Sequence, residues 1–245
     1  SRDQLNDFYR RISVLLRTDK NIFGDETLEI PHAYVRAWLS QEDNPYSASA
    51  EDGAEALAES FYAQFKEDAE ELSFYEAIHL PELLERAGRK KARREVEENH
   101  DWFWRVLDAG DVYRTWGKLD EALELYQRCR GIAEELVQTR GTSEDQRDLS
   151  VSYSRIANIY KAQGRLEEAL KLYQKDLEIA EELAQTRGTP GDQRDLSVSY
   201  NKVGDIYNAQ GKLEEALKLY QQGLAITEEL AQTRGTPGDQ RDLSV

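Results

Sequence analysis

The sequence predicts an all-α protein: an α-solenoid of antiparallel helix hairpins that follows an irregular helical N-terminal cap. Residues 148–194 and 195–241 are two copies of one unit, identical at 36 of 47 positions, and a more divergent copy fills residues 101–147. A repeat of about 20–50 residues is typical of a solenoid, in which each unit buries its apolar face against its neighbours. Residues 242–245 repeat the opening of the unit, so we interpret them as the truncated start of a further one.

The first hundred residues lack this clear period. We interpret residues 1–50 as an irregular helical cap or as the tail of an upstream domain. Within them, an amphipathic helix is expected to stop near Thr18, and residues 19–30 are expected to form a loop. Helical spacing resumes at residue 51. Residues 51–100 are therefore predicted to be helical, as a degenerate hairpin whose second helix Pro81 interrupts.

The second copy shows how a unit is built. Its first helix ends at Gly164, and residues 165–185 then form a second helix without proline or glycine. Gly188 suits the left-handed end of that helix, and residues 189–192 are expected to form a turn followed by an N-cap. Each unit is therefore predicted to be a helix hairpin with a tight turn inside it and a longer loop before the next unit.

Composition limits the functional classes. A net charge of −16 argues against nucleic acid and anionic membranes as main partners, although the acidity also serves to keep a helical surface dissolved. No apolar run of about 18 residues is present, so no membrane span is expected. The single cysteine, Cys129, is expected in the core and suits a reducing compartment, which predicts a cytoplasmic location. Methionine is absent, so we expect both ends to be boundaries of a fragment.

Two local features each allow two interpretations. A basic run consists of Arg86, Arg89, Lys90, Lys91, Arg93 and Arg94. It is either a secondary patch for an acidic partner or nucleic acid, or a solvated helix face balanced by the glutamates that follow. An aromatic group consists of Trp102, Phe103, Trp104 and Trp116. It is either a ligand pocket or a seal between the repeats and the preceding helices.

No catalytic constellation is found. The histidines His32, His79 and His100 are far apart, and neither a His-Glu-x-x-His nor a Cys-x-x-Cys pair occurs, so no metal and no cofactor are predicted. The Gly-Lys pairs at residues 117–118 and 211–212 lack the rest of a phosphate-binding loop, and we interpret them as hairpin turns. The chain is therefore not expected to be an enzyme.

A more specific pattern recurs in the second and third copies: Tyr-x2-aliphatic-small-x2-Tyr, then Gly four residues on, then Ala-x3-Tyr. It consists of Tyr153, Ile156, Ala157, Tyr160, Gly164, Ala169 and Tyr173, and again of Tyr200, Val203, Gly204, Tyr207, Gly211, Ala216 and Tyr220. This pattern resembles the tetratricopeptide repeat, in the long-helix form of kinesin light chains and many bacterial regulatory proteins. The resemblance implies that the first helix of each hairpin lines a concave groove and the second forms the outer surface.

Several of the eleven differences between the two near-identical copies are polar exchanges on the first helix, where a ligand would lie. The predicted partner-binding residues are Asp108, Asp111, Arg114, Ser154, Arg155, Asn158, Lys161, Asn201, Lys202, Asp205 and Asn208. They would hold an extended peptide or a partner helix through hydrogen bonds and charges. The alternative is free drift of surface positions, because second-helix exchanges such as Asp176/Gly223 are interpreted as equally free.

The sequence thus predicts a protein–protein interaction scaffold, as a fragment of a larger protein, with an unidentified protein or peptide as its partner. The alternative is a structural, sensing or self-assembling arm of a multidomain bacterial regulatory or defence protein, whose effector domain lies outside this chain. Self-association through the ends of the array belongs to that alternative. Nucleic-acid binding through residues 86–94 is a third interpretation, which strong salt dependence of binding would support.

Overall fold

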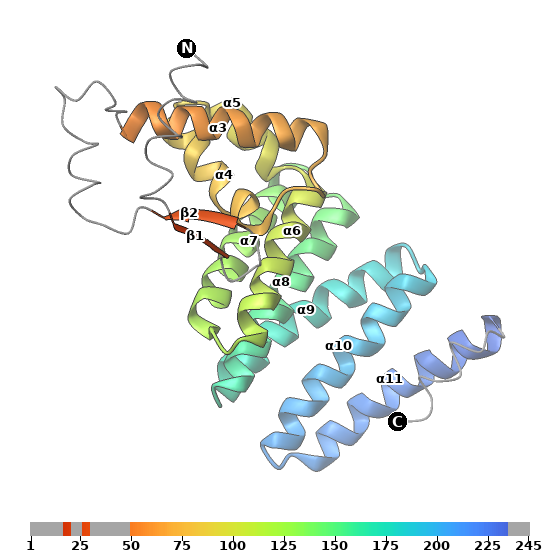
Figure 1. The fold of residues 1–245 in the computed structure, drawn as a ribbon. Coiled ribbons are helices and arrows are strands. Elements are labelled where there is room, and N and C mark those ends of the chain that lie inside the picture. The colour runs from red at the N-terminus through yellow and green to blue at the C-terminus, as the bar shows by residue number, and fades with distance from the viewer. Residues whose placement is uncertain (1–16, 21–25, 30–49, 235–245) are drawn as a thin grey trace. The chain divides into compact units, whose positions relative to one another are not determined.

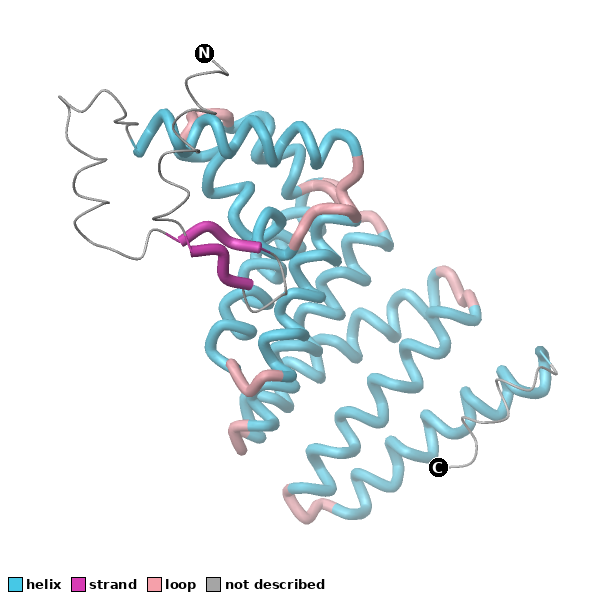
Figure 2. Tube along the Cα trace, viewed as in Figure 1, coloured by secondary structure: helices cyan, strands magenta, loops and turns pink. Residues whose placement is uncertain are grey.

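A computed structural model describes residues 17–20, 26–29 and 50–234 of the chain. Apart from two short strands, the described residues form helices and the turns between them (Figures 1 and 2). The fold is an all-α helical repeat. The chain divides into two compact units, residues 1–116 and 117–245, and the division falls inside the first predicted repeat.

Two strands lie where a loop was predicted. β1 (Arg17–Lys20) and β2 (Glu26–Glu29) pair antiparallel, with Arg17 opposite Glu29. The predicted loop over residues 19–30 is therefore wrong in part. Strands of four residues leave little periodicity to recognise in the sequence. The rest of the predicted N-terminal cap lies outside the described residues.

The described residues of the first unit form four helices, α3 (Ala50–Glu67), α4 (Phe74–Arg86), α5 (Lys90–Glu97) and α6 (His100–Thr115). Helix α3 packs on α4, and α4 packs on both α5 and α6. Ser73 caps α4 in a capping box with Glu76, in which each side chain accepts a hydrogen bond from the other residue's backbone N–H. Leu72, Leu80 and Leu84 are fully buried and form part of the core of this unit.

Helix α4 continues through Pro81, contrary to the predicted interruption. A proline inside a helix leaves the carbonyl four residues earlier without its usual donor, and here that carbonyl belongs to Ala77. The indole Nε1–H of Trp102, on α6, donates to the Ala77 carbonyl oxygen at 2.8 Å. A tertiary contact thus replaces the missing helical hydrogen bond. Trp102 and Phe103 are buried in this unit, which fits the interpretation of these two residues as a packing seal, whereas Trp116 is exposed.

Up to residue 234, the second unit forms five helices, α7 (Leu119–Thr139), α8 (Ser143–Ala162), α9 (Leu166–Thr186), α10 (Pro190–Ala209) and α11 (Leu213–Arg234). Each packs against the next along the chain, as Figure 1 shows from green to blue. Gly164 and Gly211 turn the chain inside the two near-identical hairpins with φ of 75° and 76°, a backbone region that favours glycine. A core of Ala157, Tyr173 and Ile206 joins α8, α9 and α10.

The first helices begin earlier than predicted. Thr189 is the N-cap of α10, and its Oγ1 accepts a hydrogen bond from the Asp192 backbone N–H at 3.1 Å. Asp192 therefore lies in the first turn of the helix, and Pro190 opens it at a position where its missing N–H is not needed. Only residues 187–189 connect α9 to α10, as residues 163–165 connect α8 to α9. The predicted longer loop between units is therefore wrong.

Candidate functional site

The predicted partner-binding residues of the second unit differ in exposure. Asn201, Asp205 and Asn208 are exposed, and their spacing places them on one face of α10. Four others are partly buried: Arg155, Asn158, Lys161 and Lys202. Ser154 is buried, with 5% of its surface exposed, so its hydroxyl is not available to a ligand in this structure.

A buried carboxylate lies beneath this surface. Asp176, on α9, is only 3% exposed. Its carboxylate accepts hydrogen bonds from the hydroxyl of Ser150 on α8 and from that of Ser199 on α10, the latter at 3.1 Å. Lys202 Nζ, also on α10, lies 3.3 Å from Asp176 Oδ2. One carboxylate thus joins the first helix of its own hairpin to the first helix of the next, and these partners offset its burial.

Lys202 has a second partner in the same cluster. Its amino group donates to Ser154 Oγ at 2.6 Å, across the boundary between the two hairpins. The interpretation of the Asp176/Gly223 exchange as free surface drift is therefore wrong. Asp176 follows Tyr173 by three residues and precedes Ala180 by four, so it shares their buried helix face. The spacing from Tyr173 and Ala180 could therefore have indicated from the sequence that Asp176 is buried.

A second set of polar contacts lies further along the first helices. Lys161 Nζ lies 2.9 Å from Asp205 Oδ2, which links α8 to α10. The phenol of Tyr220 donates to Asp205 Oδ1 at 3.0 Å, and that of Tyr173 donates to Asn158 Oδ1 at 2.6 Å. Burial raises the pKa of Tyr173 and of Tyr220, so both phenols stay protonated and act as donors at neutral pH. The structure therefore brings Lys161 and Asp205 together, and tyrosines of the repeat pattern orient Asn158 and Asp205.

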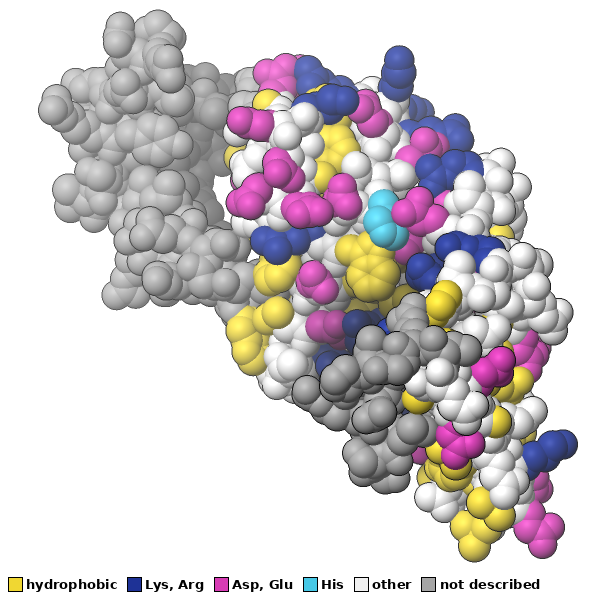
Figure 3. Space-filling model, turned by 90° about the vertical axis from the view of Figure 1, so that its right-hand side faces the viewer, with side chains coloured by type: hydrophobic (Ala, Val, Ile, Leu, Met, Phe, Trp, Pro, Cys, Tyr) yellow, Lys and Arg dark blue, Asp and Glu magenta, His cyan; other side chains and the backbone are white. Residues whose placement is uncertain are grey.

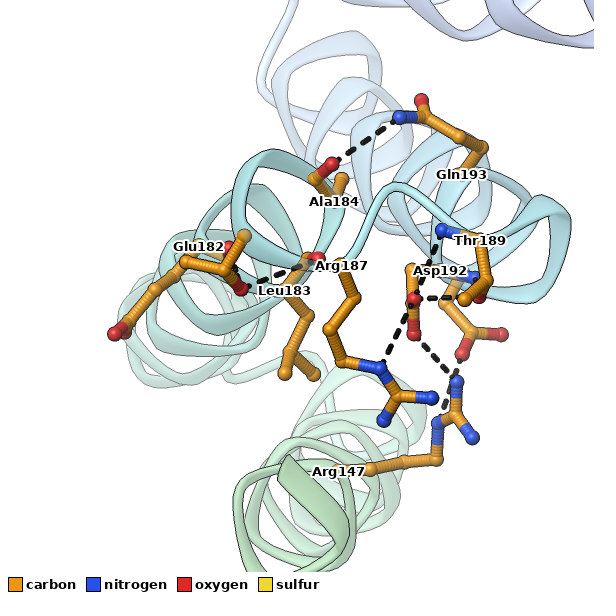
Figure 4. A network of polar contacts seen from close by, with 10 residues as sticks. Arg147, Glu182, Leu183, Ala184, Arg187, Thr189, Asp192 and Gln193 are labelled. Atoms are coloured by element: carbon orange, nitrogen blue, oxygen red, sulfur yellow. Dashed lines mark hydrogen bonds and ion pairs between the residues drawn. The ribbon is translucent and has the colours of Figure 1, made fainter. Parts of the chain in front are cut away.

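A third cluster surrounds the N-terminus of α10 (Figure 4). Arg147, on α8, places Nη2 2.7 Å from Asp192 Oδ1, and Arg187 Nε lies 3.5 Å from the other carboxylate oxygen. Asp192 is only 1% exposed. The same carboxylate also accepts the hydroxyl of Thr189 at 2.5 Å. This cluster fixes the end of one hairpin to the start of the next.

The cluster has an equivalent 47 residues earlier, at the start of α8. There Arg140 forms an ion pair with the buried Asp145, next to the N-cap Thr142. Burial raises the pKa of Asp145, but hydrogen bonds from Arg140 and Thr142 outweigh burial and hold that pKa below its ordinary value. Neither Asp145 nor Asp192 was predicted to be a buried ion-pair partner. Their signal was the Thr-x-x-Asp spacing of a capping box, which occurs at the start of α8 and again at the start of α10.

The predicted residues Asp108, Asp111 and Arg114 lie on α6, in the first unit. Asp111 Oδ1 lies 3.5 Å from Arg114 Nε, so these two form a local pair on their own helix. Asp108 lines a cavity of about 450 Å³ together with Trp104 and His100. The cavity is polar, because Glu70, Asp101 and Arg105 complete its lining. The cavity is lined by both acidic and basic side chains, so it is not a purely aromatic ligand pocket.

The basic run of the first unit is largely paired with glutamates. The pairs are Arg86–Glu82, Arg89–Glu59, Arg93–Glu85, Arg93–Glu97 and Arg94–Glu98, at 2.5 to 2.9 Å. Lys90 and Lys91 line a cavity of about 510 Å³ with Tyr62 and Glu95. Figure 3 shows side chains of both charges on the one face of the described residues that it draws. This arrangement favours the interpretation of the run as a solvated, internally balanced surface.

The described residues hold no group of three His, Cys, Asp or Glu side chains placed to bind a metal ion. His79 lies beside Tyr75 and His100 beside Trp104, with ring centroids 4.4 Å and 6.0 Å apart, and His32 lies outside the described residues. Cys129 is fully buried, and burial raises the pKa of its thiol to about 12, which leaves the thiol protonated and unreactive. Within the described part of the chain, every helix is too short or too polar to cross a membrane.

Comparison with known proteins gives a consistent result for the repeats. Residues 148–229 match a family model described as tetratricopeptide repeat, and residues 107–135 match a second model with the same description. No curated protein matches the chain.

Solved structures with a similar fold include BtubC (BKLC) from P. vanneervenii, at 18% identity over 73% of this chain and 75% of that chain, with a TM-score of 0.47. A kinesin light chain-like protein of Podosopora anserina with nearly identical TPR-like repeats is 20% identical over 83% of this chain and 94% of that chain, with a TM-score of 0.42. MamA is 15% identical over 76% of this chain and 98% of that chain, with a TM-score of 0.39. At these scores the neighbours carry no argument about function.

Proposed function

The helices within residues 107–135 and 148–229 belong to the tetratricopeptide repeat family, and from this premise we propose that the chain binds an extended peptide or a partner helix. Arrays of such repeats are protein-interaction scaffolds, because stacked hairpins expose long continuous surfaces. No catalytic role is proposed. We also propose a cytoplasmic location, because Cys129 is a free thiol and free thiols are typical of a reducing compartment.

The proposed contact surface centres on α10. The observation that carries it is the exposed polar row of Asn201, Asp205 and Asn208, with Lys161 of α8 beside it through its ion pair with Asp205. Asparagine side chains offer both a donor and an acceptor, which suits the backbone of an extended peptide. Partly buried Arg155 and Asn158 border this row on α8.

Two of the predicted residues take no part in the proposed contact. Ser154 is buried, and the amino group of Lys202 is shared between Ser154 and Asp176. On α6, Asp108, Asp111 and Arg114 occupy the equivalent repeat positions and are proposed to contribute to partner binding in the first unit.

A second candidate function is self-assembly through the last hairpin. Leu213, Leu217 and Leu224 of α11 are exposed at 64%, 57% and 46%. Their equivalents 47 residues earlier, Leu166, Leu170 and Leu177, pack against cores shared with the following helix. In an array the first helix of a further hairpin would cover such a face, and in the self-assembling alternative a second copy of the chain would cover it.

The test is capture of partners from lysate of the source organism by the full chain, with identification by mass spectrometry. The variant Asn201→Ala/Asn208→Ala removes two hydrogen-bonding groups, which corresponds to about a tenfold loss of affinity. The matched control Lys171→Ala/Gln174→Ala truncates exposed polar residues of α9. Circular dichroism and thermal unfolding show whether each variant keeps the fold.

A partner retained by the wild type and the control but lost by the α10 variant would support the proposed surface. Equal capture by all three proteins would contradict it. Recovery of the chain's own parent protein alone would favour self-assembly instead.

A further inference from the structure

Several of the positions that differ between the two near-identical hairpins contact one another. Lys202 donates to Ser154 Oγ at 2.6 Å and lies 3.3 Å from Asp176 Oδ2, while Lys161 lies 2.9 Å from Asp205. All five residues are exchanged in the other copy: Arg155, Asn201, Gly223, Asn208 and Asn158 stand at the equivalent positions. Exchanges caused by free drift of a surface have no reason to meet in this way.

Two of the exchanges are also matched in size inside each hairpin. A Cβ atom added to Gly223 would lie 2.9 Å from Asn201 Oδ1 and 3.0 Å from the backbone oxygen of Ser197. Asn201 therefore occupies space that an aspartate at position 223 would need. In the preceding hairpin the shorter Ser154 leaves that space to Asp176. A small serine at position 154 is thus combined with an aspartate at position 176, and the larger asparagine at position 201 with a glycine at position 223.

We propose that these residues, here named the pairing residues (Ser154, Lys161, Asp176, Lys202 and Asp205), determine which first helix packs on which second helix. The hairpin α8–α9 presents Lys161, the Ser154 hydroxyl and the buried Asp176 carboxylate to α10. Helix α10 presents the lysine and the aspartate that meet them. The pairing residues thus distinguish α10 from the other first helix of nearly the same sequence.

The apolar residues alone cannot make this distinction. Leu213, Leu217 and Leu224 repeat Leu166, Leu170 and Leu177 without change, so α11 offers the same leucines as α9. A copy of α10 packed on α11 would, however, place Lys202 opposite Gly223, without a carboxylate. Burying part of a charged side chain without a partner is unfavourable, so the wrong pairing is penalised. The pairing residues would therefore oppose exchange of helices between repeats or between copies of the chain.

The test transfers the α11 pattern to the preceding hairpin. Ser154→Asn/Lys161→Asn/Asp176→Gly gives α8–α9 the residues that α10–α11 has, so the pattern inside that hairpin stays matched. On α10, Lys202 loses Ser154 and Asp176, Ser199 loses Asp176, and Asp205 loses Lys161; on α8, the hydroxyl of Ser150 loses its acceptor. We expect the thermal unfolding midpoint to fall by about 5 °C, and amide protection against hydrogen exchange to fall in α10 and α11. Adding Lys202→Leu removes the stranded charge and is expected to restore at least half of the loss.

A reciprocal experiment uses the last hairpin as it exists in the chain. Gly223→Asp is expected to lower the unfolding midpoint, and Asn201→Ser in the same chain is expected to recover most of that loss. Recovery in both experiments supports the pairing residues. A triple variant as stable as the wild type, or midpoint shifts of the single and combined variants that simply add, would overturn the proposal.

Discussion

The two units differ in their ion pairs, because the second unit has almost fully buried carboxylates beside exposed pairs such as Lys161–Asp205. In the first unit, pairs such as Lys66–Glu95 and Arg89–Glu59 join helices through side chains that are between about 37% and 58% exposed. In the second unit, the carboxylates of Asp145, Asp176 and Asp192 are at most 4% exposed. An exposed pair is typically worth about 0–1 kcal/mol, whereas breaking a buried one costs about 3–5 kcal/mol. The number of ion pairs is therefore a poor guide to what holds either unit together.

The helix termini explain how the second unit accommodates two of these buried carboxylates. Asp145 and Asp192 lie in the first turn of α8 and α10, where backbone N–H groups are unpaired and the helix dipole favours negative charge. Each also has an arginine partner that remains partly in solvent, Arg140 or Arg147. The 47-residue repeat then places one such carboxylate at the start of each of these helices.

Replacing Asp192 gives the largest effect that this comparison predicts. Asp192→Ala removes the capping-box acceptor and the shared partner of Arg147 and Arg187. We expect the free energy of unfolding of the second unit to fall by about 3 kcal/mol. Chemical denaturation followed by circular dichroism measures the change. The matched control is Asp195→Ala, which removes an exposed carboxylate whose Oδ2 lies 3.3 Å from Arg147 Nε. Equal losses in the two variants would show that depth does not matter here.

The first unit has a buried polar contact of its own, and it gives the next largest effect. Trp102→Phe removes the donor to the carbonyl oxygen of Ala77, which lacks its usual helical donor because Pro81 stands four residues later. An unsatisfied buried carbonyl costs about 1–3 kcal/mol, so we expect a loss of about 2 kcal/mol in the unfolding free energy. Pro81→Ala restores a backbone N–H to α4, so Trp102→Phe should cost less in that background. A loss of the same size in both backgrounds would assign the effect to packing volume alone.

The repeated part of the fold was predictable because its signals repeat. Apolar spacing and glycine turns specify the hairpins of the second unit, and the family models match residues 107–135 and 148–229. The continuation of α4 through Pro81 was not predictable, because its cause is a tertiary hydrogen bond from a residue 21 positions away in sequence. The length of the loops was misjudged because Thr189 is already the N-cap, so most of the residues predicted to form a turn lie in the first turn of α10.

The candidate site was predictable only in part, for a related reason. Sequence spacing places a residue on a helix face, but it does not show which neighbouring helix covers that face. Ser154 was therefore grouped with Asn201, although one is buried and the other exposed. Asp176 was grouped with surface residues because charged side chains are usually exposed, whereas its three partners come from α8 and α10. A buried polar cluster contains residues from several helices, whereas the pattern of one helix indicates only the residues that this helix contributes.

The smallest expected effect comes from the exposed network of the first unit. Glu95 accepts hydrogen bonds from Lys66 Nζ at 2.5 Å and from the Tyr62 phenol at 2.6 Å, and these contacts lower the pKa of the Glu95 carboxyl. Because that pKa is lowered on folding, the contribution is present at neutral pH and is lost as the pH falls through the lowered pKa. Glu95→Gln should therefore reduce the unfolding midpoint slightly at pH 7 and low salt. At roughly 1 M salt, where screening acts over about 3 Å, the difference from the wild type should vanish. A large loss that persists at high salt would mean that depth does not separate the two units, and that Lys66 and Tyr62 are as important for folding as the buried carboxylates of α8, α9 and α10.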